Sequence, residues 1–238
     1  MLPYDSEVLY AVLAQYNRAV WPAVLIAYAL GLGLVALALR PHPWGGRVAG
    51  LAPAARVTGI ALAAFWAWVG AAWHLIHFAP INFAAPLYGG LFIAQAALFA
   101  WTGAVRGRLG LRFRADARGW MGLGLAASGL IAYPVIFLAL GDGWQGTPLV
   151  GLAPVPTTLF TLGILLLIEG RSLWHLLAVP VLWSLIDGAT AWVLGMHEDL
   201  VLPAAGIVTA GLVGWRRWRQ IGKGHEGRDR YKRGATGQ

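Results

Sequence analysis

The distribution of positive charge constrains the fold of this chain more than any other feature. Seven apolar stretches can be drawn along the 238 residues, and of the 18 Lys and Arg residues all but Arg18 fall in alternate gaps between these stretches or in the C-terminal tail. Lys and Arg near the ends of membrane spans are retained on the cytoplasmic side. The pattern therefore predicts a multi-pass membrane protein whose basic gaps and tail face the cytoplasm.

The composition independently indicates a membrane protein. Hydrophobic residues make up 58% of the chain and charged residues only 12%, whereas a soluble domain carries about 25% charged residues. The chain has no cysteine, which excludes disulfides, thiolate metal sites and cysteine nucleophiles. Asp5 and Glu7 stand where a signal peptide would be basic, so we expect no signal peptide here.

Span length and charge together predict the path of the chain. A span needs about 20 mainly apolar residues, which places seven transmembrane helices at residues 19–39, 57–79, 81–105, 119–140, 149–168, 173–195 and 199–215. The gap after the third span holds five arginines that should anchor its orientation: Arg106, Arg108, Arg112, Arg114 and Arg118. We expect an all-α polytopic membrane bundle with its N-terminus outside and its C-terminus in the cytoplasm.

Two flanking segments complete the predicted organisation. Residues 1–18 carry apolar residues at helical spacing and should form a short amphipathic helix on the outer surface, capped by Asp5 or Ser6. Residues 19–218 form the seven-span bundle. Residues 219–238 are rich in Gly, Arg and Lys and are expected to be a disordered cytoplasmic tail attracted to anionic lipid, with no specific nucleic-acid role.

Ionisable groups at membrane depth are costly, so they are candidates for function. Asp187 lies in the sixth span, about 12 Å below its outer end at 1.5 Å per residue. His74 and His77 lie near the outer end of the second span, and residues three apart share one face of an α-helix. With Asn82, which opens the third span from the same side, these residues predict a ligand or proton site in the outer half of the bundle.

Structural roles remain open for the same residues. The histidines could be interfacial side chains with one ring nitrogen in water, or a buried hydrogen-bonded pair, and Asp187 could bond a neighbouring helix. A metal site at His74 and His77 would need Asp187, His197 or Glu198 as further ligands.

Several activities are excluded because the residues that they need are missing. The only lysines are Lys223 and Lys232 in the tail, so there is no intramembrane lysine for a retinal Schiff base. There is no phosphate-binding loop ending in Gly-Lys-Ser or Gly-Lys-Thr and no His-Glu-x-x-His zinc helix. The sequence predicts no catalytic residue and identifies no cofactor.

Three stretches resemble a known family. They are Tyr16-Asn17-Arg18-Ala19-Val20-Trp21-Pro22-Ala23, the run from Trp73-His74 through Phe78-Ala79-Pro80-Ile81-Asn82 to Gln95-Ala96, and Arg106-Gly107-Arg108-Leu109. Together they resemble a bacterial multi-pass inner-membrane family catalogued as a domain of unknown function. The resemblance implies a bacterial inner-membrane location and the same number of spans, and it implies no activity.

Three functions agree with these features. The main prediction is a small permease or solute-binding protein with a polar site in the outer half of the bundle. The first alternative is a structural or accessory subunit that packs against itself or a membrane partner. The second is a metal or redox protein that uses His74 and His77. A water-accessible cavity reaching Asp187 would favour the main prediction over a close-packed accessory subunit.

Overall fold

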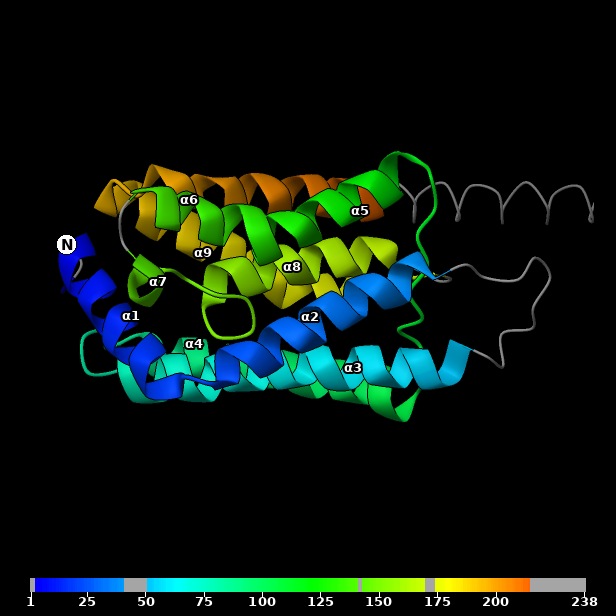
Figure 1. Ribbon diagram of the computed structural model, residues 1–238, viewed down its shortest axis with the longest axis horizontal. Helices are drawn as coiled ribbons and strands as arrows, with labels where there is room; N and C mark the ends of the chain where they lie inside the picture. Colours follow the sequence, from blue (N-terminus) through cyan, green and yellow to red (C-terminus); the bar gives the residue numbers. More distant parts are fainter. Residues whose placement is uncertain (1–2, 41–50, 141–142, 170–173, 215–238) are drawn as a thin grey trace, which may run out of the picture.

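The computed structural model is a bundle of long helices that run side by side along one axis (Figure 1). It describes residues 3–40, 51–140, 143–169 and 174–214. Helices α1 (Ser6–Val20) and α7 (Gly143–Gly146) lie at one end, which we call the α1 end. Residues 106–116 cross the opposite end, which we call the arginine end.

Helices occur at all seven predicted positions. They are α2 (Ala23–Leu39); α3 (Leu51–Trp68) with η2 (Val69–Phe78); α4 (Ala85–Phe99) with η3 (Ala100–Val105); α5 (Ala117–Ala127) with η4 (Ser128–Ala132) and α6 (Tyr133–Leu140); α8 (Pro154–Leu167); η5 (Trp174–Leu177) with α9 (Ala178–Leu194); and, after η6 (His197–Leu200), a helix over Val201–Gly214. The predicted all-α class is confirmed for the described part of the chain.

Not every helix is long enough by itself to cross a membrane. Within the described residues four helical segments are long and apolar enough, and the bent pair α1 and α2 adds a fifth if it counts as one span. Helix α8 and the helix Val201–Gly214 are apolar but shorter.

Helix α1 lies across the end of the bundle, because the chain turns by 89° between α1 and α2. Its N-terminus is capped as the sequence predicts: the Asp5 carboxylate accepts a hydrogen bond from the Val8 backbone N–H at 2.9 Å. Such a cap satisfies one of the N–H groups that have no partner in the first helical turn. The buried face of α1 carries Leu13, Tyr16 and Asn17.

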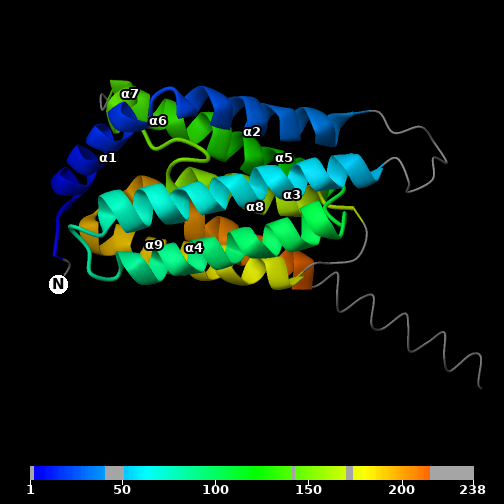
Figure 2. The same ribbon diagram turned by 90° about the horizontal axis from the view of Figure 1, so that it is seen from below.

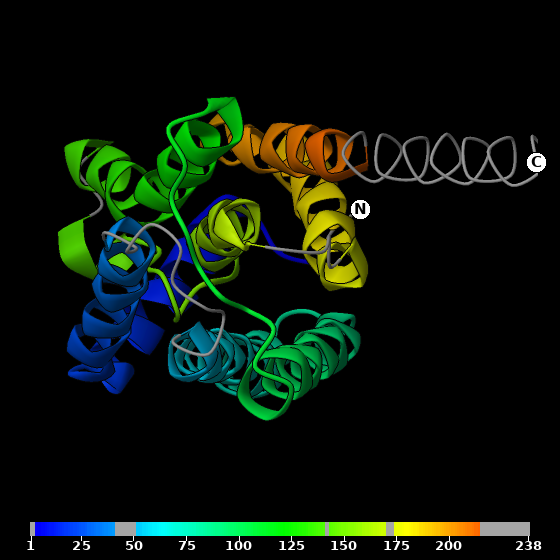
Figure 3. The same ribbon diagram turned by 90° about the vertical axis from the view of Figure 1, so that its right-hand side faces the viewer.

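Helix α8 is the core of the bundle, and every one of its residues is buried. Figures 2 and 3 show it in the middle of the molecule, with the other long helices around it. A helix that is apolar on all sides needs such a position. Close packing is achieved through small residues: a Cβ on Gly163 of α8 would lie 2.5 Å from the Gly122 carbonyl oxygen of α5. The two backbones therefore touch, as small residues permit in membrane bundles.

The segment 106–116 closes the arginine end (Figure 3). The Arg112 N–H donates to the Leu167 carbonyl at 2.9 Å, and the Phe113 N–H donates to the Ala38 carbonyl at 2.8 Å. Carbonyls in the last turn of a helix lack intrahelical partners. The segment therefore supplies hydrogen-bond donors to carbonyls at the C-terminal ends of both α8 and α2.

Candidate functional site

A cavity of about 80 Å³ lies at the α1 end of the bundle. Its walls come from α1, η2, α4, α6, α9 and the residues that lead into α8. One water molecule needs about 10–15 Å³ of such space. The cavity therefore has room for several waters or for a small solute.

Nine of the 19 residues that line the cavity have aromatic side chains. They come from five helices and from the segment before α1, and they are Tyr4, Tyr10, Trp73, His74, Phe78, Tyr88, Tyr133, Phe137 and Trp183. Many of these rings also contact each other edge-on; for example, the Tyr88 and Trp183 ring centroids lie 5.2 Å apart. Such edge-to-face pairs stabilise one another beyond simple burial. The wall is therefore rigid and largely apolar.

Two carboxylates interrupt this aromatic wall. Asp187 comes from α9, and its Oδ2 atom is buried without a hydrogen-bond partner. Asp199 comes from η6 and accepts a hydrogen bond from the Tyr133 hydroxyl. Gly195 ends α9 in the left-handed region with a φ of 72°, a conformation that favours glycine. This turn brings η6 back over the bundle, so that the two carboxylates interact electrostatically.

His74 is the second polar group of the wall that lacks a partner. It is fully buried, and neither ring nitrogen has a hydrogen-bond partner. Its ring centroid lies 4.8 Å from that of Phe92 and 5.1 Å from that of Trp183. Most buried polar atoms in proteins are hydrogen-bonded. Because His74 and Asp187 line the same cavity with unpaired atoms, the cavity is a place for a polar occupant.

His77, the other predicted histidine, points away from the cavity. Its Nδ1 donates to the Ala72 carbonyl at 2.8 Å, and its ring lies 4.9 Å from that of Tyr16 in α1. The reason is the π-helical geometry of η2, which contains both histidines. A π-helix has i→i+5 hydrogen bonds and is wider than an α-helix, so residues three apart no longer share one face.

Asn82 also lies outside the cavity wall. Its side chain bonds two nearby segments of the chain. Its Oδ1 accepts a hydrogen bond from the Ala84 N–H at 2.9 Å, just before α4. Its side chain also bonds the hydroxyl of Tyr4. Burial raises the pKa of the Tyr4 phenol to about 12, so this hydroxyl stays protonated at neutral pH. Asn82 therefore positions a wall residue.

The structure gives no support to a metal centre. His197 does not line the cavity, and in the part of the chain that the structure describes no group of three or more His, Asp or Glu residues could hold a metal ion. The predicted set of His74, His77, Asp187 and His197 does not come together.

Two residues, Tyr16 and Asn17, hold helix α1 over the cavity. Both belong to the first of the stretches that resemble the family, residues 16–23. Tyr16 donates its hydroxyl hydrogen bond to the Leu152 carbonyl at 3.0 Å and accepts one from the Trp68 indole at 2.8 Å. Asn17 donates to the carbonyls of Gln145 at 2.6 Å and Thr147 at 2.8 Å. These bonds attach α1 to the loop before α8, which itself forms part of the wall.

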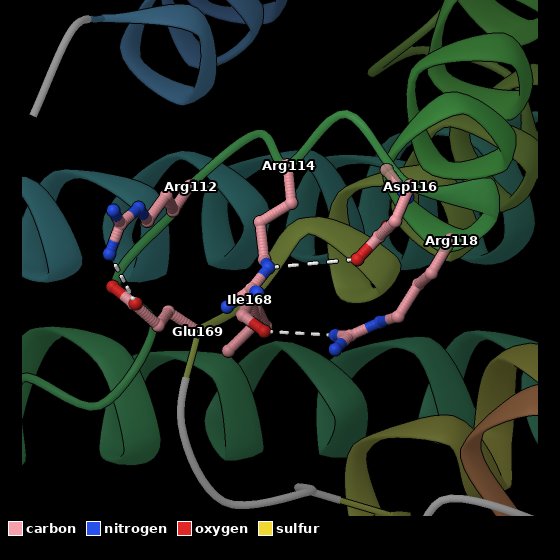
Figure 4. Close-up of polar contacts among 7 residues, drawn as sticks. Arg112, Arg114, Asp116, Arg118, Ile168 and Glu169 are labelled. Atoms are coloured by element: carbon pink, nitrogen blue, oxygen red, sulfur yellow. Dashed lines mark hydrogen bonds and ion pairs between the residues drawn. The ribbon is translucent and has the colours of Figure 1, made fainter.

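A second polar cluster lies at the arginine end (Figure 4). Arg112 pairs with Glu169 at 2.8 Å, Arg114 lies 3.6 Å from Asp116, and Arg118 donates to the Ile168 carbonyl at 2.9 Å. Both ion pairs are exposed, and exposed pairs contribute little stability. The contacts attach the segment 106–116 to the end of α8, and the orienting role of the arginines stays a prediction.

Sequence reasoning missed Asp199, Tyr133 and Trp183 as wall residues. Trp183 precedes Asp187 by four residues, so helical spacing alone could have placed both on one face of α9. Nothing in the sequence pairs Tyr133 with Asp199, because their contact depends on how η6 folds back.

Comparison with known proteins places the chain in a family. No curated protein and no solved structure matches it. Residues 6–222 match the family described as "Family of unknown function (DUF6064)". This match covers the whole bundle, including α1 and both ends of the molecule. The chain therefore belongs to this family of unknown function, DUF6064.

Proposed function

We propose that the protein is a small permease or solute-binding protein of the bacterial inner membrane. In this proposal the chain crosses the membrane seven times, the α1 end faces outside, and the arginine end and the tail face the cytoplasm. The solute binds in the cavity beneath α1.

Charge and tryptophan placement support the seven-span arrangement. The arginines between Arg106 and Arg118 belong to the arginine end, and the acidic residues Asp5 and Glu7 to the α1 end. Exposed tryptophans occur at both ends, as expected for side chains at membrane interfaces: Trp21 and Trp144 at the α1 end, and Trp101, Trp120 and Trp174 at the other.

The short helix α8 is compatible with a span. Its 14 residues reach about 21 Å at 1.5 Å per residue, less than the hydrocarbon core of about 30 Å. The remaining depth is covered by the non-helical residues 147–153, which are all buried in protein. Non-helical backbone at membrane depth is tolerated where protein surrounds it.

One observation carries the binding function: a cavity in an apolar bundle is lined by three side chains with buried polar atoms that have no partner, namely Asp187 Oδ2, both ring nitrogens of His74 and the Trp183 indole nitrogen. Unpaired polar groups at membrane depth are costly and commonly mark substrate paths or binding sites. Asn17 and Gln95, elsewhere in the core, each donate to backbone carbonyls, although their side-chain oxygens have no partner. His74, Trp183 and Asp187 differ from these residues because they line the cavity, where an occupant can bond their unpaired atoms.

Cysteine accessibility tests this proposal, because the natural chain has no cysteine. Thr190 lines the cavity, whereas Leu185, on the same helix, is exposed on the bundle surface. Thiols react as thiolates, so only a hydrated position should be labelled. We expect Thr190→Cys to react with 2-aminoethyl methanethiosulfonate in membranes and Leu185→Cys to stay unreactive. Glu7→Cys, on the exposed face of α1, serves as the positive control.

An unreactive Thr190→Cys beside a reactive Glu7→Cys would contradict the proposal. Such a dry interior would favour the structural or accessory subunit instead.

A further inference from the structure

We propose that the cavity binds a small organic cation, a protonated amine on an apolar body. This assignment rests on the proposed function and names its class of ligand. It is carried by three features of the wall: its charge, its aromatic lining and its unpaired acceptors.

The charge of the wall favours a cation. Asp187 and Asp199 both line the cavity, and no Lys or Arg among the described residues does so. Charges interact strongly in an apolar bundle, where the effective dielectric constant is low. Two carboxylates in such a site repel each other; a bound cation relieves this repulsion and favours their ionised form, whereas a carboxylate ligand would add to it.

The lining favours an organic cation over a metal ion. A hard metal ion such as Ca²⁺ requires six to eight oxygen ligands, whereas this wall has two carboxylates and nine aromatic rings among its 19 residues. Aromatic rings attract ammonium groups electrostatically, Trp and Tyr most strongly. The same rings bury an apolar ligand body. Trp183 and Tyr88 combine both properties beside Asp187.

The unpaired acceptors favour an ammonium group that carries N–H donors. Asp187 Oδ2 can accept a charge-assisted hydrogen bond, which is stronger than a neutral one. His74 has two ring nitrogens without partners at full burial, and the neutral imidazole offers one of them as an acceptor. Asp199 already accepts from Tyr133, so Asp187 is the principal counter-ion in this arrangement.

Three compounds of one shape test the assignment: benzylammonium, benzyl alcohol and benzoate, which are cationic, neutral and anionic. Binding is measured by calorimetry on the full chain in lipid nanodiscs at pH 7, against empty nanodiscs. We expect benzylammonium to bind at least about tenfold more tightly than benzyl alcohol, the factor of a single charge-assisted hydrogen bond. Benzoate should not bind.

Asp187→Asn keeps the shape of the side chain and removes its charge. It should reduce the affinity for benzylammonium by at least about tenfold and leave that for benzyl alcohol unchanged. Glu7→Gln removes an equal charge from the exposed surface at the same end and should have no effect. His74→Phe retains the aromatic wall but removes the acceptor, so it should also weaken benzylammonium binding.

Equal binding of the cation and the alcohol, or no binding by any of the three compounds, would overturn the assignment. These measurements use the natural chain, so they do not depend on whether a variant folds. If Thr190→Cys is nevertheless reactive, the cavity is hydrated, and only the class of ligand is wrong. If Thr190→Cys is unreactive, the proposed function itself fails.

Discussion

At the scale of single residues, the buried polar groups of this bundle differ in whether they join segments of the chain or face the cavity. Asn17 and Gln95 are both fully buried, and both donate to backbone carbonyls of distant segments. The Trp66 indole likewise donates to the Thr161 hydroxyl at 2.9 Å. By contrast, both ring nitrogens of His74 and the Asp187 Oδ2 atom have no hydrogen-bond partner, and both residues line a cavity. The sequence cannot reveal this difference, because each bond joins segments far apart in the chain.

Asn17→Ala should destabilise the protein, because it leaves the Gln145 and Thr147 carbonyls without their donor. Each lost hydrogen bond with a buried unpaired group costs about 1–3 kcal/mol, so we expect the two to lower the free energy of unfolding by about 2–6 kcal/mol. Denaturant unfolding in mild detergent measures it. Gln15→Ala, on the exposed face of the same helix, should change stability little. Equal losses in both variants would mean that Asn17 does not hold α1.

At the scale of helices, the contact between α5 and α8 depends on glycine. A Cβ on Gly163 would overlap the Gly122 oxygen and the Ala126 backbone nitrogen. Backbone atoms cannot move aside as a flexible side chain can. The small residues of the apolar stretches therefore matter at the points where two helices cross in close contact.

Gly163→Ala should separate α5 from α8, and overpacking of this kind costs about 1–3 kcal/mol. Gly124→Ala on α5 is the matched control, since nothing lies within 4 Å of its added Cβ. In an open helical position alanine is favoured over glycine by about 0.5–1 kcal/mol. The two changes should therefore shift the thermal unfolding midpoint in opposite directions. A stabilising Gly163→Ala would refute the close contact.

Much of this helical order could be predicted from the sequence. Apolar runs located every long helix, and the acidic residue before the run that starts at Ser6 predicted the Asp5 cap. The π-helical segment η2 could not be predicted, because apolar periodicity does not distinguish it from an α-helix. That one change of helix type separates His77 from His74 and removes it from the site. Likewise, Asp199 joined the wall through the turn at Gly195, which depends on tertiary packing.

At the scale of the whole molecule, the two ends have opposite characters. The arginine end is closed by backbone hydrogen bonds and exposed ion pairs. The α1 end holds the cavity, the carboxylates and a helix that lies across the bundle. The proposed solute-binding site thus lies at the end opposite the arginines between Arg106 and Arg118. The site and the predicted orientation signal therefore lie at opposite ends of the bundle.

Cysteine labelling in intact bacterial cells tests this orientation and the odd number of spans. Glu7→Cys reports the α1 end, Ala115→Cys reports the exposed surface of the arginine end, and a cysteine added after Gln238 reports the tail. Translocating the basic segment 106–118 is unfavourable, so it should stay in the cytoplasm. We expect a membrane-impermeant maleimide to label Glu7→Cys in intact cells and the other two only after permeabilisation. If Glu7→Cys and the added cysteine were labelled from the same side, the number of spans would be even. If Ala115→Cys were labelled in intact cells, the arginines would not set the orientation, and the cavity would face the cytoplasm.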